Sequence, residues 1–244
     1  MTSLSVNLNK IALLRNSREG DNPNLLDFAN LCIRSGVHGL TIHPRPDQRH
    51  ARYADVYNLA ALVSEHQNVE LNIEGNPGEK FLQVVLEARP TQCTLVPDDP
   101  AQLTSDHGWD VKNNAGRLKE IVEQLHESNI RSSIFLDPDL EQLLPAKETG
   151  TDRIELYTKS YAHAFGQSNE SPVFEQFRKT AQKASELGLG LNAGHDLNQQ
   201  NLGKFLTIPG ILEVSIGHGL MIEALLSGFE LTIANYLAIL AVTD

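Results

Sequence analysis

The sequence predicts one domain of the α/β class, a (β/α)8 (TIM) barrel that spans residues 1–244. Short β-like runs alternate with longer helical runs along the whole chain, and eight such pairs can be distinguished. No stretch has the composition of a linker. A doubly wound open sheet is the alternative, but it usually has fewer strands and needs a glycine fingerprint after its first strand, which this sequence lacks.

The individual elements follow from local patterns. Each expected strand is a short run of apolar and β-branched residues that ends at a turn signal. In chain order, the strands are expected at 4–9, 39–43, 69–74, 92–97, 131–137, 153–158, 189–194 and 212–217. Between them, apolar residues recur at helical spacing, and several runs close on Gly or Pro, which are helix stop signals. Helices are expected at 24–36, 54–66, 78–90, 114–129, 139–150, 171–188, 198–210 and 219–240.

Alternation within the strands separates a polar face from an apolar face. In the third strand Glu70, Asn72 and Glu74 share one face, as Thr41 and His43 do in the second. Helices cover the outside of a barrel, so the apolar faces should point outward and the polar faces should line the interior. Unpaired buried polar groups are costly, so the upper interior is expected to form a polar active site. The same pattern puts three more residues on polar faces: Glu155, Glu213 and Ser215.

The composition limits the possible partners. A formal net charge of −11 argues against nucleic acid and against an anionic membrane surface, but it allows a local cationic pocket for a small anion. No apolar run is long enough to span a bilayer, and residues 1–16 lack the features of a signal peptide, so the cytoplasm is expected. The two cysteines, Cys32 and Cys93, have no metal-ligand spacing and are expected to be buried.

Candidate chemical groups gather where the strands end, which is where barrel enzymes carry their working residues. His43 ends the second strand, Glu74 ends the third, and His195 follows the seventh. Carboxylates and imidazoles together indicate acid–base chemistry. His43 and Glu74 lie on neighbouring strands and could form a proton-transfer pair, although a structural ion pair would give the same pattern. No catalytic metal is expected, because the first strand lacks His-x-His and no HExxH motif occurs.

Two glycine-containing turns favour phosphate binding. NAGHD (192–196) follows the seventh strand, and SIGHGL (215–220) follows the eighth strand and opens a helix. Barrels often bind phosphate at these two loops, at the N-terminus of a helix. Two ordinary tight turns are the alternative interpretation.

A second anion site is indicated in HPRPDQRH (43–50), where Arg45 could fork onto phosphate oxygens and His50 could add a donor. A solvated basic loop is the alternative, and this alternative is preferred for Arg49 and Arg52. The sequence thus offers two positions for anions near one group of acid–base residues.

Taken in order, the motifs resemble the pyridoxine 5′-phosphate synthase family over nearly the whole chain. The resemblance is carried by VNLNKIALLRNSREG (6–20), TIHPRPDQRH (41–50), LNIEG (71–75), TLVPD (94–98), LTSDHGWDV (103–111), RIELYTKSYA (153–162), LNAGHDL (191–197) and EVSIGHGL (213–220). It implies a barrel with additional helices and a homo-octamer, a tetramer of dimers. It also implies condensation of 1-deoxy-D-xylulose 5-phosphate with 3-amino-2-oxopropyl phosphate to pyridoxine 5′-phosphate, phosphate and water in vitamin B6 biosynthesis, with no metal or organic cofactor.

The resemblance also implies roles for individual residues. His43 corresponds to the general base, Glu74 to a second acid–base residue and His195 to the proton donor, while Glu155 corresponds to the residue that stabilises the transition state. The aminooxopropyl phosphate site corresponds to Asn7, Arg18, the backbone around Asp196, Gly217 and His218. The deoxyxylulose phosphate site corresponds to Asn9, Lys10, Arg45, His50 and Thr104.

Three departures indicate a divergent branch of that family. Asn9-Lys10 replaces Asp-His after the first strand, which removes a negative charge and alters the affinity expected for deoxyxylulose phosphate. Asp196 and Lys159 each stand where the family usually has glycine. Two other interpretations stay open: a catalytically silent paralogue that binds a phosphorylated metabolite, and another phosphate-binding barrel enzyme such as an isomerase or epimerase. The four acid–base residues argue against the first, and the second cationic cluster argues against the other.

Overall fold

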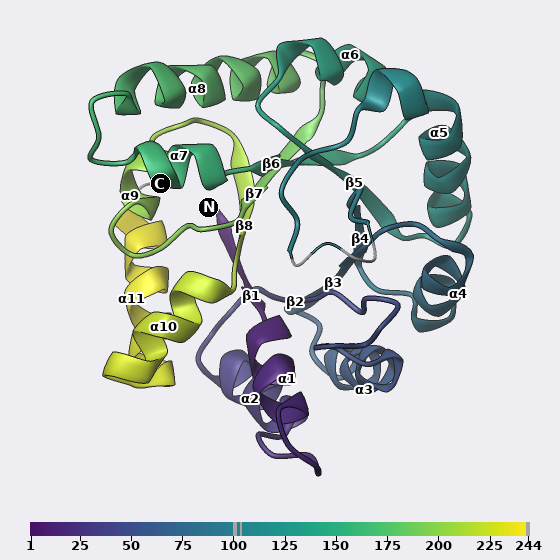
Figure 1. Cartoon of the computed structure of the whole chain (residues 1–244), viewed down its shortest axis with the longest axis vertical. Coiled ribbons are helices and arrows are strands. Elements are labelled where there is room, and N and C mark those ends of the chain that lie inside the picture. The colour runs from purple at the N-terminus through teal and green to yellow at the C-terminus, as the bar shows by residue number, and fades with distance from the viewer. Residues whose placement is uncertain (100–101, 103, 243–244) are drawn as a thin grey trace.

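Eight parallel strands close into a barrel in the computed structural model, which describes residues 1–99, 102 and 104–242 (Figure 1). The strands follow one another around the barrel in chain order, and β8 pairs back with β1 through Ser3–Glu213 and Ser5–Ser215. The predicted (β/α)8 architecture is therefore confirmed. The strands are β1 Ser3–Asn7, β2 Gly39–Ile42, β3 Glu70–Gly75, β4 Gln92–Leu95, β5 Arg131–Leu136, β6 Arg153–Tyr157, β7 Gly190–Gly194 and β8 Ile211–Ile216.

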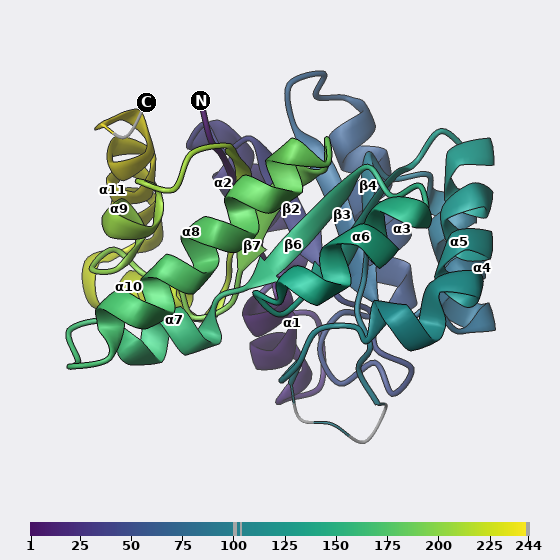
Figure 2. The same cartoon turned by 90° about the horizontal axis from the view of Figure 1, so that it is seen from above.

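Helices surround the barrel on its outer side (Figure 1). Those expected from periodicity are α2 Leu25–Arg34, α3 Tyr53–Ser64, α4 Glu79–Ala88, α5 Val111–Glu127, α6 Leu140–Glu148, α8 Glu170–Glu186, α9 Leu202–Phe205, α10 His218–Ser227 and α11 Phe229–Val242. Two short helices that local patterns did not indicate follow β1 and β6 directly, and they lie on the same side of the molecule (Figure 2). They are α1 Asn9–Asn16 and α7 Lys159–Ala164.

Several boundaries differ from the prediction by a few residues, and three differences change the description of an element. The first strand ends at Asn7 instead of Asn9, because the Asn7 Oδ1 accepts a hydrogen bond from the Asn9 N–H at 3.0 Å and turns the chain into α1. The single helix expected over 219–240 is two helices, because Gly228 has a φ of +88° that a continuing helix does not allow. The helix expected over 198–210 is reduced to the single turn α9.

The barrel interior is polar, as the strand alternation predicted. The Ser5 and Thr41 hydroxyls lie 2.7 Å apart, the Asn72 amide donates to Thr41 at 3.4 Å, and Thr94 donates to the Asn72 oxygen at 3.0 Å. The alternate strand residues face the helices and are buried with them in the hydrophobic core, among them Leu4, Leu40, Ile134 and Leu156. Each such side chain contributes about 1.5–3 kcal/mol through burial. The apolar core therefore lies between sheet and helices, and the interior remains available for polar groups.

Ion pairs fill the amino-terminal end of the barrel. Arg131 on β5 binds Glu70 on β3, with Nη1 and Oε1 3.1 Å apart. Arg153 on β6 donates to the Asn192 amide oxygen at 3.0 Å and lies 3.8 Å from a Glu213 oxygen. The residues that sequence analysis singled out lie at the opposite, carboxyl-terminal end. Within the described part of the chain, no helix is long and apolar enough to cross a membrane.

Candidate active site

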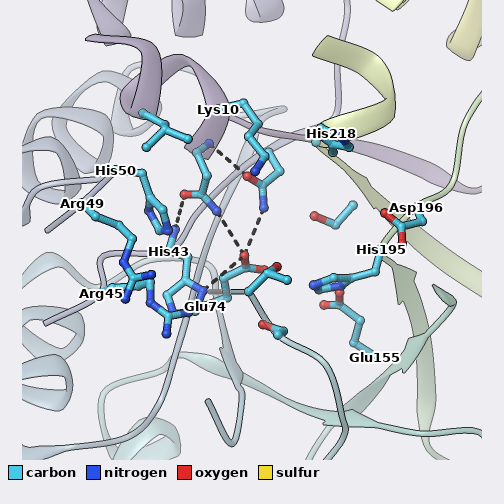
Figure 3. Close-up of a pocket in the computed structure, with 17 residues that line it drawn as sticks. Lys10, His43, Arg45, Arg49, His50, Glu74, Glu155, His195, Asp196 and His218 are labelled. Atoms are coloured by element: carbon cyan, nitrogen blue, oxygen red, sulfur yellow. Dashed lines mark hydrogen bonds and ion pairs between the residues drawn. The ribbon is translucent and has the colours of Figure 1, made fainter. Parts of the chain in front are cut away.

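A cavity of about 380 Å³ opens at the carboxyl-terminal end of the barrel. All the residues proposed from sequence line it except Arg18, which is exposed and lies outside the lining. Arg49, expected only in a solvated loop, also lines the cavity. Figure 3 shows the labelled side chains converging from several strand ends. The structure therefore brings together groups that are far apart in the sequence.

His43 and Glu74 form the centre of the site. The Nδ1 of His43 lies 3.8 Å from Oε1 of Glu74, and both side chains are buried. Burial, reinforced by the neighbouring His50 and Arg45, lowers the pKa of His43 well below 6.5, so its imidazole is neutral and can accept a proton. Burial raises the pKa of Glu74 to about 7. A neutral imidazole beside a carboxyl group that titrates near neutrality is suited to general acid–base catalysis.

Two asparagines hold the Glu74 carboxylate (Figure 3). The Asn7 amide donates to Glu74 Oε1 at 3.0 Å, and the Asn9 amide donates to the same oxygen at 3.4 Å. The Asn9 oxygen in turn accepts the backbone N–H of His43 at 2.8 Å. The sharp turn between β1 and α1 therefore connects both members of the central pair.

His195 lies against an aromatic wall that sequence analysis missed. Its ring centroid is 5.0 Å from that of Phe135 and 5.1 Å from that of Tyr157. Phe135 and Tyr157 directly follow the outward-facing Ile134 and Leu156. Because successive side chains of a strand point to opposite faces, the alternation could have placed both rings inside the barrel. Burial lowers the pKa of His195 to about 4, so its imidazole is neutral.

The backbone at His195 is unusual. His195 has a φ of +82° and Asp196 a φ of +59°, two consecutive non-glycine residues in the left-handed region. The Asn201 amide donates to the Asp196 carbonyl at 3.1 Å and supports this turn. Asp196, which replaces the expected glycine, lines the cavity, and its charge opposes the effect of burial on the pKa of His195. Lys159 lies outside the lining, and its charge adds to the lowering of that pKa.

Glu155 lies deeper in the barrel and is almost completely buried. Burial, followed by the charges of Glu74 and Glu213, raises its pKa well above 4.5, which favours the neutral acid over the carboxylate. Among the described residues, its Oε2 has no hydrogen-bond partner. Gly194 leaves the space for this side chain, since a Cβ there would lie 2.4 Å from Glu155 Oε1.

The Gly194→Ala variant should therefore lose about 10²-fold in kcat, because its methyl group displaces the Glu155 carboxyl and small misplacements in a site are costly. Gly116→Ala, on α5 with no atom within 4 Å of the new Cβ, is the matched control and should keep full activity. Equal rates for the two variants would contradict the role of Gly194. Circular dichroism would verify that both are folded.

One side of the cavity is cationic. Arg45 is buried and pairs with Asp98 at 2.8 Å, and its other terminal nitrogen donates to the carbonyls of Asp99 and Gln102. Its Nε is buried without a partner among the described residues. His50 lies nearby, with its pKa lowered to about 4 by burial and then by Arg45. This side can therefore supply donors to an anion.

The opposite side is the start of α10. Gly217 and His218 line the cavity there, at the N-terminus of a ten-residue helix, where free backbone N–H groups attract anions. Figure 3 shows His218 and Asp196 across the cavity from Arg45 and His50. The acid–base groups thus lie between two candidate anion positions. Within the described ranges, no group of three His, Cys, Asp or Glu side chains could hold a metal ion.

Comparisons with known proteins identify the family. The model of the family "Pyridoxal phosphate biosynthesis protein PdxJ" matches residues 4–242. Pyridoxine 5′-phosphate synthase of Flavobacterium johnsoniae is 51% identical over 238 residues, which cover 97% of this chain and 98% of the relative. The synthase of Parabacteroides distasonis is 50% identical over 241 residues, which cover 98% and 99%.

Solved structures support the fold alone. Phosphoribosyl anthranilate isomerase from Thermus thermophilus has a TM-score of 0.59 at 14% identity, with both chains covered completely. A mutant tryptophan synthase α-subunit from Pyrococcus furiosus has a TM-score of 0.62 at 11% identity, with coverage of 99% and 100%. The family match and the relatives near 50% identity decide the assignment: this chain belongs to the PdxJ family of pyridoxal phosphate biosynthesis proteins.

Proposed function

We propose that the chain is a pyridoxine 5′-phosphate synthase, which condenses 1-deoxy-D-xylulose 5-phosphate with 3-amino-2-oxopropyl phosphate to pyridoxine 5′-phosphate, phosphate and water. The observation that carries the proposal is the placement of His43, Glu74, Glu155 and His195 around one cavity between two anion positions. Relatives near 50% identity that bear this name support it. Two phosphorylated substrates need two anion sites, and ring closure needs several proton transfers.

The protonation states of the acid–base residues indicate which of them accepts a proton and which donates one. Neutral His43 accepts a proton, and Glu74, with a pKa of about 7, can accept or return one. Glu155, whose pKa burial raises, can in its neutral form donate a hydrogen bond to a developing negative charge. His195 needs added negative charge to become a proton donor, and a substrate phosphate at the nearby α10 N-terminus would supply it by raising the pKa of the imidazole.

The proposed aminooxopropyl phosphate site comprises Asn7, Arg18, the backbone at Asp196, Gly217 and His218. The deoxyxylulose phosphate site comprises Asn9, Lys10, Arg45, His50 and Thr104. All of these residues except Arg18 line the cavity, which supports their assignment to the two phosphate sites. No metal or organic cofactor forms part of the proposal.

A homo-octamer, built as a tetramer of dimers, and a cytoplasmic location are also part of the proposal. Exposed apolar side chains on α10 favour self-association, since Leu225 is 84% and Leu226 85% exposed. Analytical ultracentrifugation should give a species eight times the 26.9 kDa mass of the chain. A monomer at micromolar concentration would exclude the octamer.

The activity itself is tested by incubating the purified protein with both substrates and detecting pyridoxine 5′-phosphate by chromatography. Product should form with both substrates together and with neither alone. An active family member serves as the positive control. Absence of product beside an active control would refute the proposed function.

A further inference from the structure

Both ends of the Asn9 amide are engaged inside the site. The backbone N–H of His43 donates to Asn9 Oδ1 at 2.8 Å, and a backbone N–H can only donate. This contact fixes the orientation of the amide group, so its NH2 must face the other way. There it lies 3.4 Å from Oε1 of Glu74. Asn9 is therefore a bridge between the two central acid–base residues.

Asn7 strengthens the bridge from the preceding strand. Its amide nitrogen donates to the same Glu74 oxygen at 3.0 Å, and its own oxygen accepts the Asn9 N–H at 3.0 Å. Two uncharged donors thus meet at one carboxylate oxygen, which also lies 3.8 Å from His43 Nδ1 (Figure 3). Hydrogen bonds to a carboxylate stabilise its charged form.

We propose that Asn9 is a positioning residue that keeps Glu74 ionisable beside His43, by donating a hydrogen bond that an ionised carboxylate at this position could not donate. The inference rests on the proposed function, because it concerns the same site. It adds a role for Asn9 that does not depend on contact with a substrate. The bridge needs the amide as an acceptor at one end and as a donor at the other.

The charges around Glu74 explain why the donor matters. Burial raises the pKa of Glu74, and the amides of Asn7 and Asn9 oppose that rise. An aspartate at position 9 would keep the contact with the His43 N–H but would bring a second carboxylate to Glu74, and two carboxylates in one site hold a proton between them. Further ionisable groups act on or face Glu74 from the segments that follow β2 and β4 and from β6 and β8, and the Asn9 variants leave these groups unchanged: His43, Asp98, Glu155 and Glu213.

The test compares the pH profiles of kcat/KM for the wild type, Asn9→Ala and Asn9→Asp. The limb that reports ionisation of Glu74 should move to higher pH by about 1–3 units in Asn9→Asp and by less in Asn9→Ala, which loses one donor without adding a charge. Asn68→Asp adds the same charge at an exposed residue between α3 and β3, and its profile should match the wild type. Asn9→Ala keeps the test valid if Asn9→Asp does not fold.

A second readout needs no substrate. Carbon-13 NMR of glutamate-labelled protein follows the Glu74 carboxyl carbon, which is assigned by the signal that disappears in Glu74→Gln. Its titration midpoint should rise in the order wild type, Asn9→Ala, Asn9→Asp. Coincident midpoints, or a changed KM for deoxyxylulose phosphate with an unmoved profile, would overturn the positioning role. Failure of the proposed function would appear separately, as an inactive wild type whose NMR titration still discriminates the variants.

Discussion

Glu74→Gln should lose about 10²–10⁴-fold in kcat and should also be more stable than the wild type at pH 8. The loss of activity follows because glutamine cannot transfer a proton. The gain in stability follows because the wild type must keep a buried carboxylate charged at that pH. The substitution retains the shape of the side chain and an oxygen that can accept from Asn7 and Asn9.

The sign of the stability change follows from the pKa of Glu74, which burial raises to about 7 from a usual value of 4.5. Between these two pH values the folded chain holds more protons than the unfolded chain, so this group's contribution falls as pH rises. Glutamine has no such loss. The difference between variant and wild type should therefore be larger at pH 8 than at pH 4.5, by up to about 3 kcal/mol.

Urea denaturation at the two pH values measures the effect. Glu120→Gln, which removes a carboxylate from an exposed position on α5, is the matched control and should change stability little at either pH. A Glu74→Gln variant that is equally destabilised at both pH values would show that Glu74 does not carry a raised pKa. A variant with unchanged kcat would remove Glu74 from the chemistry.

His43→Ala is expected to reduce kcat by about 10²–10⁴-fold while inorganic phosphate still binds. The neutral imidazole is lost, but the groups on both anion sides of the cavity remain. The backbone N–H that holds Asn9 also remains, so the Glu74 carboxylate keeps its two amide donors. The variant thus separates the proton acceptor from the framework around it.

Steady-state kinetics and calorimetric titration with phosphate measure the two properties. His66→Ala, in the turn that follows α3 and outside the cavity lining, provides the matched control and should match the wild type in both. Substantial turnover in His43→Ala would show that another group accepts the proton. Loss of phosphate binding together with turnover would assign His43 to substrate binding instead.

Sequence patterns predict the barrel because each strand packs against helices with one face and lines a polar interior with the other. Apolar and polar residues therefore alternate along each strand, and this alternation places Glu74 and Glu155 inside the barrel. Contacts that depend on distant segments leave no such signal. The Arg45–Asp98 pair joins residues 53 positions apart, and the turn at Asn7 depends on one side-chain hydrogen bond that periodicity does not register.

The residue-level roles came from the family resemblance more than from pattern. Thirteen of the fourteen proposed residues line the cavity, with Arg18 as the exception, and their roles stay predictions until the variants are measured. The aromatic wall of Phe135 and Tyr157 shows what was overlooked. A search restricted to titratable strand ends passes over the rings that desolvate His195.

The polar interior of the barrel separates stability from chemistry. The apolar layer between sheet and helices contains the residues that resist unfolding, whereas Thr41, Asn72 and Thr94 inside contribute little apolar contact. Substitutions among the inner residues that keep every buried polar group hydrogen-bonded can therefore alter chemistry without weakening the shell. For protein engineering, the inward-facing strand residues are therefore positions where new hydrogen-bonded networks could be introduced. The apolar layer between sheet and helices would be left unchanged.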